Sequence, residues 1–139
     1  YQFSFGKADM LVDGSDATVI ASGIMVWNAL QAAEILAKEG VHIRVLNMHT
    51  IKPLDQEAVF RAARETGAIV TAENANWING LGSAVAEVIS ENDLYVPFLR
   101  VGVYDQFGEV GTIDYLMERF HLTPADIASA VRLTISRKK

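Results

Sequence analysis

The sequence predicts an α/β protein, a three-layer α/β/α sandwich around a five-stranded, mostly parallel sheet with one antiparallel edge strand. Residues 17–21 are small or β-branched, which is typical of a strand buried on both faces. Residues 24–39 place their polar side chains at helical spacing, and Gly40 ends this helix before a second strand over 41–48. A strand, a helix and a strand in this order predict a right-handed crossover to a parallel neighbour.

The antiparallel edge strand is predicted at the start of the chain. Phe3, Phe5 and residues 8–12 alternate with polar or small partners, as one short strand or as a strand broken at Gly6. Residues 13–16 form a turn that is too short for a crossover. We therefore expect this strand to pair antiparallel with the strand over 17–21.

The remaining elements follow from caps and apolar runs. They are, in chain order, a helix from its cap Asp55 to about Thr66, a strand over 68–72, a helix over 80–91, a strand over 99–103, a helix capped by Thr112, and a helix from its cap Thr123 to about Ser136. Strand and helix alternate throughout, which favours a layered sandwich.

Composition restricts the class of protein. The 139 residues are about the size of one domain, so a single domain over 1–139 is expected. The net charge of −5 argues against nucleic-acid binding, and the basic cluster at 137–139 is interpreted as a solvated helix end. No apolar run approaches the ~20 residues of a membrane span, and the absence of cysteine fits a cytoplasmic location. The chain begins with Tyr1 instead of methionine, which indicates an excised piece of a longer chain or a processed chain.

Loops beyond the carboxyl ends of parallel strands are where such sheets bind ligands. His49, Glu73, Asn76 and Trp77 are the candidates there for a ligand or interface loop. His49 is a catalytic base or, as we favour, a histidine hydrogen-bonded to neighbouring backbone. Glu73 is a general acid or base with Asn76 orienting a substrate or, as we favour, an acceptor for the free amides of the next helix. Trp77 packs against a neighbour or meets a partner surface.

Motifs for other chemistries are incomplete. Gly80 and Gly82 begin a dinucleotide fingerprint, but Val85 stands at the third glycine position, so close helix packing is favoured. There is no Walker sequence and no serine elbow. The three histidines are widely spaced, and none has a second metal ligand on its own element. No catalytic, cofactor-binding or metal-binding residue is predicted.

Several stretches in order along the chain carry a resemblance to a known family. They lie at residues 5–8, 13–16, 21–26, 47–55, 80–87, 107–109 and 120–123. Together they resemble the carboxyl-terminal domain of transketolase, in the thiamine-diphosphate enzyme superfamily. The Phe-Gly-Glu stretch at 107–109 favours transketolase over the β subunits of 2-oxo acid dehydrogenases, and deoxyxylulose-phosphate synthase is the closest competitor. The sequence departs from the pattern at 73–75, where Glu-Asn-Ala replaces the usual Glu-Glu-His or Glu-Asp-His, and at Val110, where serine is usual.

The resemblance implies one part of an enzyme that transfers two-carbon ketol units between sugar phosphates in the pentose phosphate pathway. The complete enzyme holds thiamine diphosphate and Mg²⁺ between a diphosphate-binding and a pyrimidine-binding domain. This domain is then structural: it binds no cofactor alone, packs on the pyrimidine-binding domain and helps form a homo-oligomer such as a dimer. The Gly-Asp-Gly motif for diphosphate and metal is missing, and the nearest triplet is Asp-Gly-Ser at 13–15. On its own the domain is expected to be inactive.

Two alternatives stay open. One is the equivalent domain of 1-deoxyxylulose-5-phosphate synthase or of a 2-oxo acid dehydrogenase β subunit. The other is a regulatory module in which His49, Glu73, Asn76 and Trp77 take a small anionic or nucleotide-like effector.

Overall fold

The computed structural model describes residues 2–139, so Tyr1 lies outside the described residues. In chain order the elements are β1 (Asp9–Val12), β2 (Ala17–Ala21), α1 (Met25–Ala37), β3 (Ile43–Asn47), α2 (Gln56–Thr66), β4 (Ile69–Asn76), α3 (Leu81–Glu91), β5 (Phe98–Val103), α4 (Ile113–Arg119) and α5 (Pro124–Ser136). Among residues 2–139, no helix has both the length and the hydropathy to cross a bilayer.

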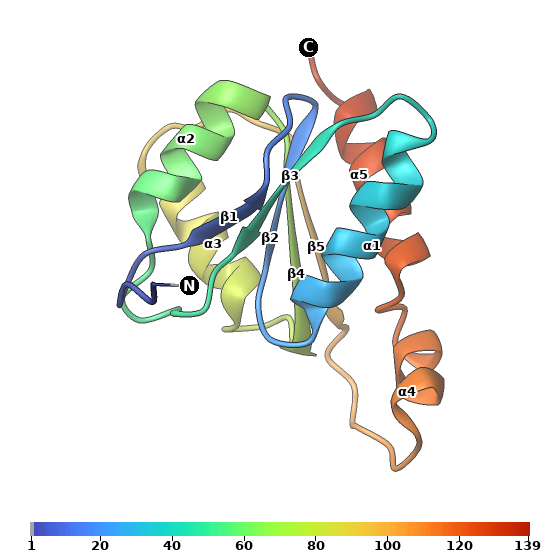
Figure 1. Ribbon diagram of the computed structural model, residues 1–139. Helices are drawn as coiled ribbons and strands as arrows, with labels where there is room; N and C mark the ends of the chain where they lie inside the picture. Colours follow the sequence, from blue (N-terminus) through green and yellow to red (C-terminus); the bar gives the residue numbers. More distant parts are fainter. Residues whose placement is uncertain (1) are drawn as a thin grey trace.

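The predicted fold class is confirmed. The strands form one five-stranded sheet in the order β1-β3-β2-β4-β5, in which only the β1–β3 pair is antiparallel. Helices α1 and α5 cover one face of the sheet, and α2 and α3 cover the other (Figure 1). All five residues of β2 are buried, as its unbroken apolar run predicts for a central strand.

The predicted neighbour of β1 is wrong. β1 pairs with β3 and not with β2, because parallel partners occupy both sides of β2. The turn over 13–16 steps across the start of β3, where the Asp16 amide donates to the His42 carbonyl (2.9 Å). A Cβ atom on Gly14 would lie 2.5 Å from the carbonyl carbon of Ile43, so only glycine allows this close passage. A short turn excludes a parallel crossover, but it does not exclude a step over one strand.

Three boundaries differ from those that the sequence predicts. β1 begins at Asp9, so the segment with Phe3 and Phe5 lies outside the sheet. α1 ends at Ala37, two residues earlier than expected. β4 continues to Asn76, where it pairs with Val103 after an irregularity in the ladder.

An arm over residues 104–120 leaves the sandwich between β5 and α5 (Figure 1). It contains α4, in which no residue is buried. The base of the arm is fixed by buried Phe120 and by Asn28 of α1, whose Nδ2 donates to the Leu122 carbonyl (2.8 Å).

A polar clamp holds the arm in shape. Glu109 accepts a hydrogen bond from the Tyr115 hydroxyl (2.8 Å) and another from Nε of Arg119 (2.8 Å). Both bonds lower the pKa of Glu109, the Tyr115 bond having the largest effect, and the bond to Glu109 raises the pKa of the Tyr115 hydroxyl. The loop and α4 are thereby connected within the arm itself.

Candidate functional site

The four parallel strands end at the same edge of the sheet, here called the carboxyl edge. β2, β3, β4 and β5 finish there at Ala21, Asn47, Asn76 and Val103 (Figure 1, lower side). β3 and β4 lie on opposite sides of β2, so the chain reverses its direction of winding at β2. Open α/β sheets bind ligands at such a point.

Glu73 makes the hydrogen bonds that its structural interpretation requires. Its side chain, on β4, accepts from the amide of Leu81 (2.7 Å) and from the amide of Gly82 (2.9 Å) at the start of α3. The residue is only 3% exposed. Both carboxylate oxygens therefore bind helix amides, as the positive end of a helix favours.

The two glycines of the incomplete dinucleotide fingerprint make room for side chains. A Cβ atom on Gly80 would lie 2.0 Å from Oε2 of Glu73, and one on Gly82 would lie 2.6 Å from Cδ of Arg100. The space that a cofactor would need is thus occupied by the protein, which agrees with the interpretation as close helix packing.

Trp77 packs against one residue on β5 and one directly after it. The Arg100 guanidinium lies over the indole ring at 4.3 Å from its centroid, and Nη1 of Arg100 donates to the Trp77 carbonyl (3.0 Å). Tyr104 meets the indole edge to face, with 4.4 Å between ring centroids. Asn76 accepts from the amide of Ile78 (2.9 Å), which fixes a turn.

The hydrogen bond expected for His49 is absent, so that interpretation is wrong. Within the described residues 2–139, neither ring nitrogen of His49 has a hydrogen-bond partner, although both atoms are buried. Nε2 lies 3.6 Å from Oδ2 of Asp9, and the Phe3 ring covers the imidazole at 4.6 Å between centroids. The segment before β1, which the sequence assigns to a strand, instead lies against this histidine.

The four candidate side chains do not converge. His49 contacts Phe3 near β1, whereas Glu73 points to α3 and Trp77 contacts β5. β2 separates the two groups within the sheet. This arrangement gives no support to one effector site built from all four residues.

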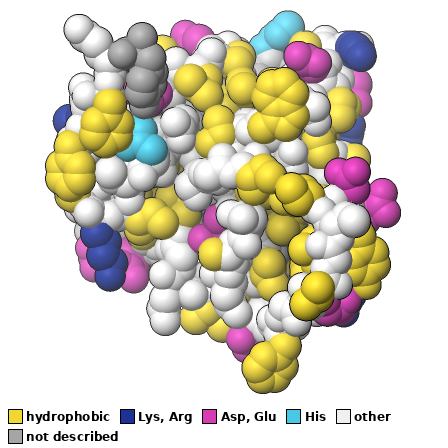
Figure 2. All heavy atoms as spheres, turned by 60° about the horizontal axis from the view of Figure 1, so that its bottom comes forward, with side chains coloured by type: hydrophobic (Ala, Val, Ile, Leu, Met, Phe, Trp, Pro, Cys, Tyr) yellow, Lys and Arg dark blue, Asp and Glu magenta, His cyan; other side chains and the backbone are white. Residues whose placement is uncertain are grey.

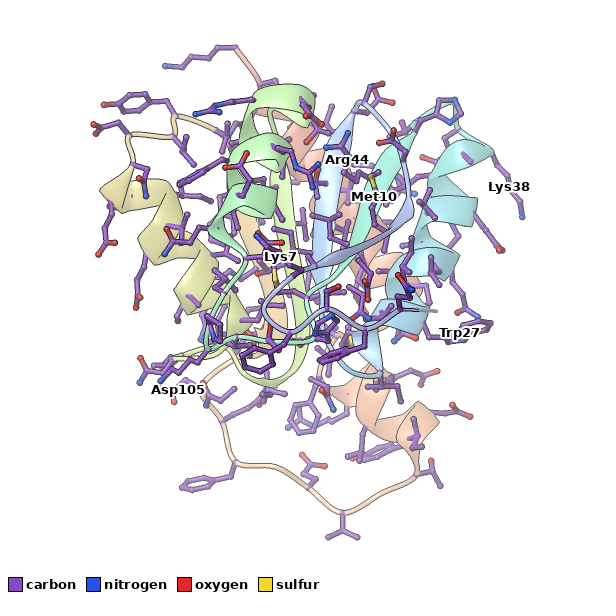
Figure 3. All side chains as sticks on the ribbon, turned by 60° about the vertical axis from the view of Figure 1, so that its left-hand side comes forward. Lys7, Met10, Trp27, Lys38, Arg44 and Asp105 are labelled. Carbon is purple, nitrogen blue, oxygen red and sulfur yellow. The ribbon has the colours of Figure 1, made fainter. Side chains whose placement is uncertain are left out.

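Two hollows open at the carboxyl edge. The β2–β3 hollow, about 610 Å³, is lined by Ser22, Trp27, Asn47 and His49 among others. The arm hollow, about 460 Å³, lies between α4 and the ends of β4 and β5, and its lining is mainly apolar. Sequence reasoning found His49 but did not single out Trp27, which lies within the predicted helix over 24–39 and whose indole points into solvent (Figure 3).

Sequence reasoning also missed the apolar side chains of the arm. Phe107 and Val110 are fully exposed. The sequence does hold a signal for these exposed side chains. Phe107 and Val110 each stand before a glycine in a segment without helix or strand pattern, so they have no place in the predicted core.

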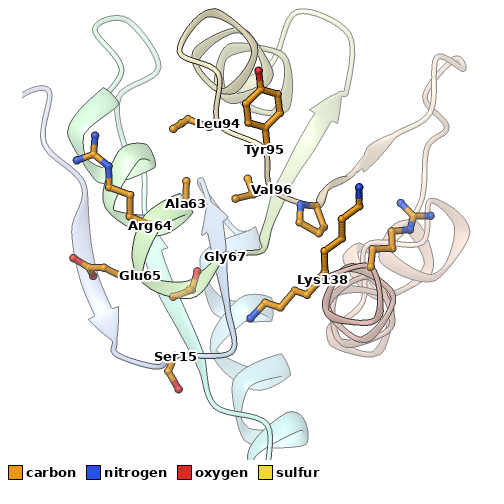
Figure 4. A pocket seen from close by; sticks show the side chains of 13 residues that line it. Ser15, Ala63, Arg64, Glu65, Gly67, Leu94, Tyr95, Val96 and Lys138 are labelled. Atoms are coloured by element: carbon orange, nitrogen blue, oxygen red, sulfur yellow. The ribbon is translucent and has the colours of Figure 1, made fainter.

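A larger hollow, about 910 Å³, lies at the opposite edge of the sheet (Figure 4). Arg64 and the basic cluster at 137–139 line it, with Tyr95 on the far side. Helices α2 and α5 both end here, and helix carboxyl ends favour cations. Lys138 donates from Nζ to the Asp16 carbonyl (2.5 Å), so one cation of the cluster binds backbone.

The described residues do not fit a metal or diphosphate site. Within residues 2–139, no three His, Asp or Glu side chains are grouped to hold a metal ion. The triplet at 13–15 lies at the amino end of β2, away from the carboxyl edge, and Asp13 is bound by Arg44 (2.9 Å). No reaction step is therefore assigned to thiamine diphosphate in this chain.

The family model described as "Transketolase, C-terminal domain" matches residues 6–127. The chain belongs to this family. Its members include transketolase-type enzymes, which depend on thiamine diphosphate.

Two curated relatives and one solved structure are similar to this transketolase domain. The chain is 56% identical over 137 residues to the 6-deoxy-6-sulfo-D-fructose transketolase subunit SqwH of Clostridium sp., and the match covers 99% of this chain and 42% of that subunit. It is 42% identical over 127 residues to 1-deoxy-D-xylulose-5-phosphate synthase of Syntrophotalea carbinolica, covering 91% of this chain and 20% of that enzyme. A solved structure, "Split gene transketolase, inactive beta4 tetramer", matches 100% of this chain and 45% of its own at 45% identity and a TM-score of 0.94. The chain thus spans less than half the length of these relatives.

Proposed function

We propose that this chain is the carboxyl-terminal structural domain of the small subunit of a split transketolase, which transfers two-carbon ketol units between sugar phosphates. The observation that carries the proposal is the 56% identity over nearly the whole chain to a subunit of a transketolase. The likeness to a split-gene transketolase at a TM-score of 0.94 supports it.

The geometry supports a role without catalytic groups. Both carboxylate oxygens of Glu73 accept hydrogen bonds from α3 amides, and the Trp77 ring packs against Arg100 and Tyr104. In the proposed enzyme, the pyrimidine-binding and diphosphate-binding domains bind thiamine diphosphate and Mg²⁺ between them. The present domain packs against them and helps to form a homo-oligomer, such as a dimer, in the cytoplasm.

Reconstitution tests this function. The full-length small subunit is mixed with the large subunit, thiamine diphosphate and Mg²⁺, and ketol transfer is measured with a ketose phosphate or with 6-deoxy-6-sulfo-D-fructose as donor. We expect turnover only when both subunits are present. Turnover by the small subunit alone would contradict the proposal.

A second candidate is the equivalent domain of 1-deoxy-D-xylulose-5-phosphate synthase, which the 42% identity to that enzyme favours. The same reconstituted protein distinguishes the two functions. Formation of 1-deoxy-D-xylulose 5-phosphate without ketol transfer would support the second candidate.

The absence of a catalytic role is tested separately with Glu73→Gln in the full-length subunit. The amide can still accept one of the two helix hydrogen bonds, so the variant should fold with a lower melting temperature. We expect kcat to be unchanged when it is measured below the unfolding temperature of both proteins. General acid–base catalysis contributes about 10²–10⁴-fold, so a loss of that size would show that Glu73 is catalytic.

A further inference from the structure

Apolar side chains gather at the carboxyl edge. We call this surface the carboxyl-edge face; its exposed apolar residues are Phe3, Ile24, Trp27, Ile78, Phe107 and Val110. All of them except Phe3 come after the ends of β2, β4 and β5 in the chain. Phe3 lies against His49, which follows β3. Figure 2 views the molecule from this side and shows hydrophobic side chains over much of it. Apolar surface gathered in this way marks an interaction site.

The arm presents part of this face in a fixed shape. The Glu109 clamp and the Asn28–Leu122 hydrogen bond hold the arm, whereas Phe107 and Val110 at its tip are fully exposed. A surface that is ordered before binding loses little further conformational entropy when a partner docks.

Unpaired polar atoms lie at the same edge. Nδ1 and Nε2 of His49 and Oγ1 of Thr50 are buried without a hydrogen-bond partner among residues 2–139, the Asp9 carboxylate lying 3.6 Å from Nε2. Buried polar atoms in proteins are nearly always paired. An imidazole can donate from one nitrogen and accept at the other, so these atoms fit a hydrogen-bonding group that enters the β2–β3 hollow from outside.

We infer that the carboxyl-edge face docks on the remaining part of the same subunit, with an apolar side chain of that part in the arm hollow and a hydrogen-bonding group beside His49. This inference rests on the proposed function. In a subunit like the Clostridium relative, of which this chain spans 42%, more than half of the polypeptide lies elsewhere. In such a subunit the two parts belong to one polypeptide. Covalent connection gives the remaining part a high effective concentration near this domain.

Hydroxyl-radical footprinting of the wild-type full-length subunit tests the docking directly. Phe107 and Trp27 lie on the face, whereas Tyr95 is 91% exposed at the opposite edge and provides an internal reference. Once each oxidation rate is divided by the intrinsic reactivity of its side chain type, we expect Phe107 and Trp27 to be oxidised several-fold more slowly than Tyr95. Equal reactivity of the three side chains would overturn the inference.

Matched variants extend the test. The double variant Phe107→Asp, Val110→Asp changes two fully exposed side chains, so the domain should still fold, and Tyr95→Asp is the control. In the double variant we expect Trp27 to become reactive and the calorimetric transition to split in two, with the mass from light scattering unchanged. The control should behave as the wild type does, and a double variant that behaves likewise would overturn the inference.

Two further outcomes separate the alternatives. If the double variant lowers the mass, and protection of Trp27 is lost only with the oligomer, the face binds a second copy and the inference is overturned. If protection is intact but the reconstituted wild type shows no ketol transfer, the proposed function is contradicted while the docking face is supported.

Discussion

Glu73 replaces the side-chain cap that α3 lacks. The N-cap residue of α3 is Gly80, which has no side chain, and the amides of Leu81 and Gly82 bind the carboxylate of a residue on β4. The two bonds are shielded from water because Glu73 is buried. They fix the start of α3 to the end of β4.

Gly80→Ala should break this arrangement. The new Cβ atom would lie 2.0 Å from Oε2 of Glu73, and the carboxylate cannot move without losing a helix amide. We expect the free energy of unfolding to fall by about 1–3 kcal/mol in urea denaturation. Gly108→Ala is the control, because no atom lies within 4 Å of its added Cβ. Equal effects of the two changes would show that Gly80 is not sterically required.

Asn28 is the second residue that connects distant parts of the chain. Its Nδ2 donates to the Leu122 carbonyl at the turn before α5. Asn28→Ala should leave that carbonyl without its partner and lower the free energy of unfolding by about 1–3 kcal/mol in urea denaturation. Asn92→Ala, which removes a bond to the Val88 carbonyl near the surface, should cost less. The opposite order would contradict the role of Asn28.

At the scale of elements, Asp55 connects α2 to the segment before β1. One oxygen accepts from the Ala58 amide (3.2 Å) in the first turn of α2, and the other accepts from the Ala8 amide (3.0 Å). Burial raises the pKa of Asp55, but the two amides and the Lys7 ammonium group together hold it below its ordinary value. The charged form is therefore the one that the fold stabilises.

Asp55→Asn should remove a pH-dependent part of the stability. The pKa of Asp55 is lower in the folded state than the value of about 3.9 in the unfolded chain. Its contribution is thus fully present above pH ~4 and is lost as the pH falls through the folded pKa. We expect the variant to be less stable by about 1 kcal/mol at neutral pH, since asparagine keeps the cap but not the charge. Urea denaturation at decreasing pH should show the difference closing below pH ~4, and a constant difference would contradict the assignment.

Elements with local signals are the ones that the sequence predicts well. Asp55, Thr112 and Thr123 all cap the helices expected of them, because a cap needs only an oxygen on one residue and an amide two or three positions later. The strand pairing of β1 and the packing of His49 against Phe3 and Asp9 could not be obtained in this way. Both depend on residues that are far apart in the sequence.

The arm illustrates the same limit for the candidate site. Its helix α4 is predicted from Thr112, and its periodic apolar pattern suggests a face packed on a core. Leu116 and Met117 of that pattern are partly buried against the core, whereas Ile113 and the loop residues Phe107 and Val110 are exposed. Periodicity shows which side chains share a face and does not show whether that face belongs to the core or to a partner.

For the whole molecule, the sheet order predicts how amide protection is distributed. β2 lies between two strands and is buried along its length, whereas β1 is a four-residue edge strand with Met10 half-exposed. We expect the amides of β2 to exchange with deuterium most slowly and those of β1 much faster, because edge strands open without disturbing the core. Exchange of β2 as fast as that of β1 in the full-length subunit would contradict this order.

The irregular edge at β1 has a further consequence. The pairing of β1 with β3 shifts register between Met10 and Val12, and the charged side chains of Lys7 and Asp13 stand at its two ends. A short, bent strand of this kind cannot serve as a template for the sheet of another molecule. The side of the domain farthest from β5 is thus protected against edge-to-edge pairing, even though Met10 and Leu11 are about half-exposed there.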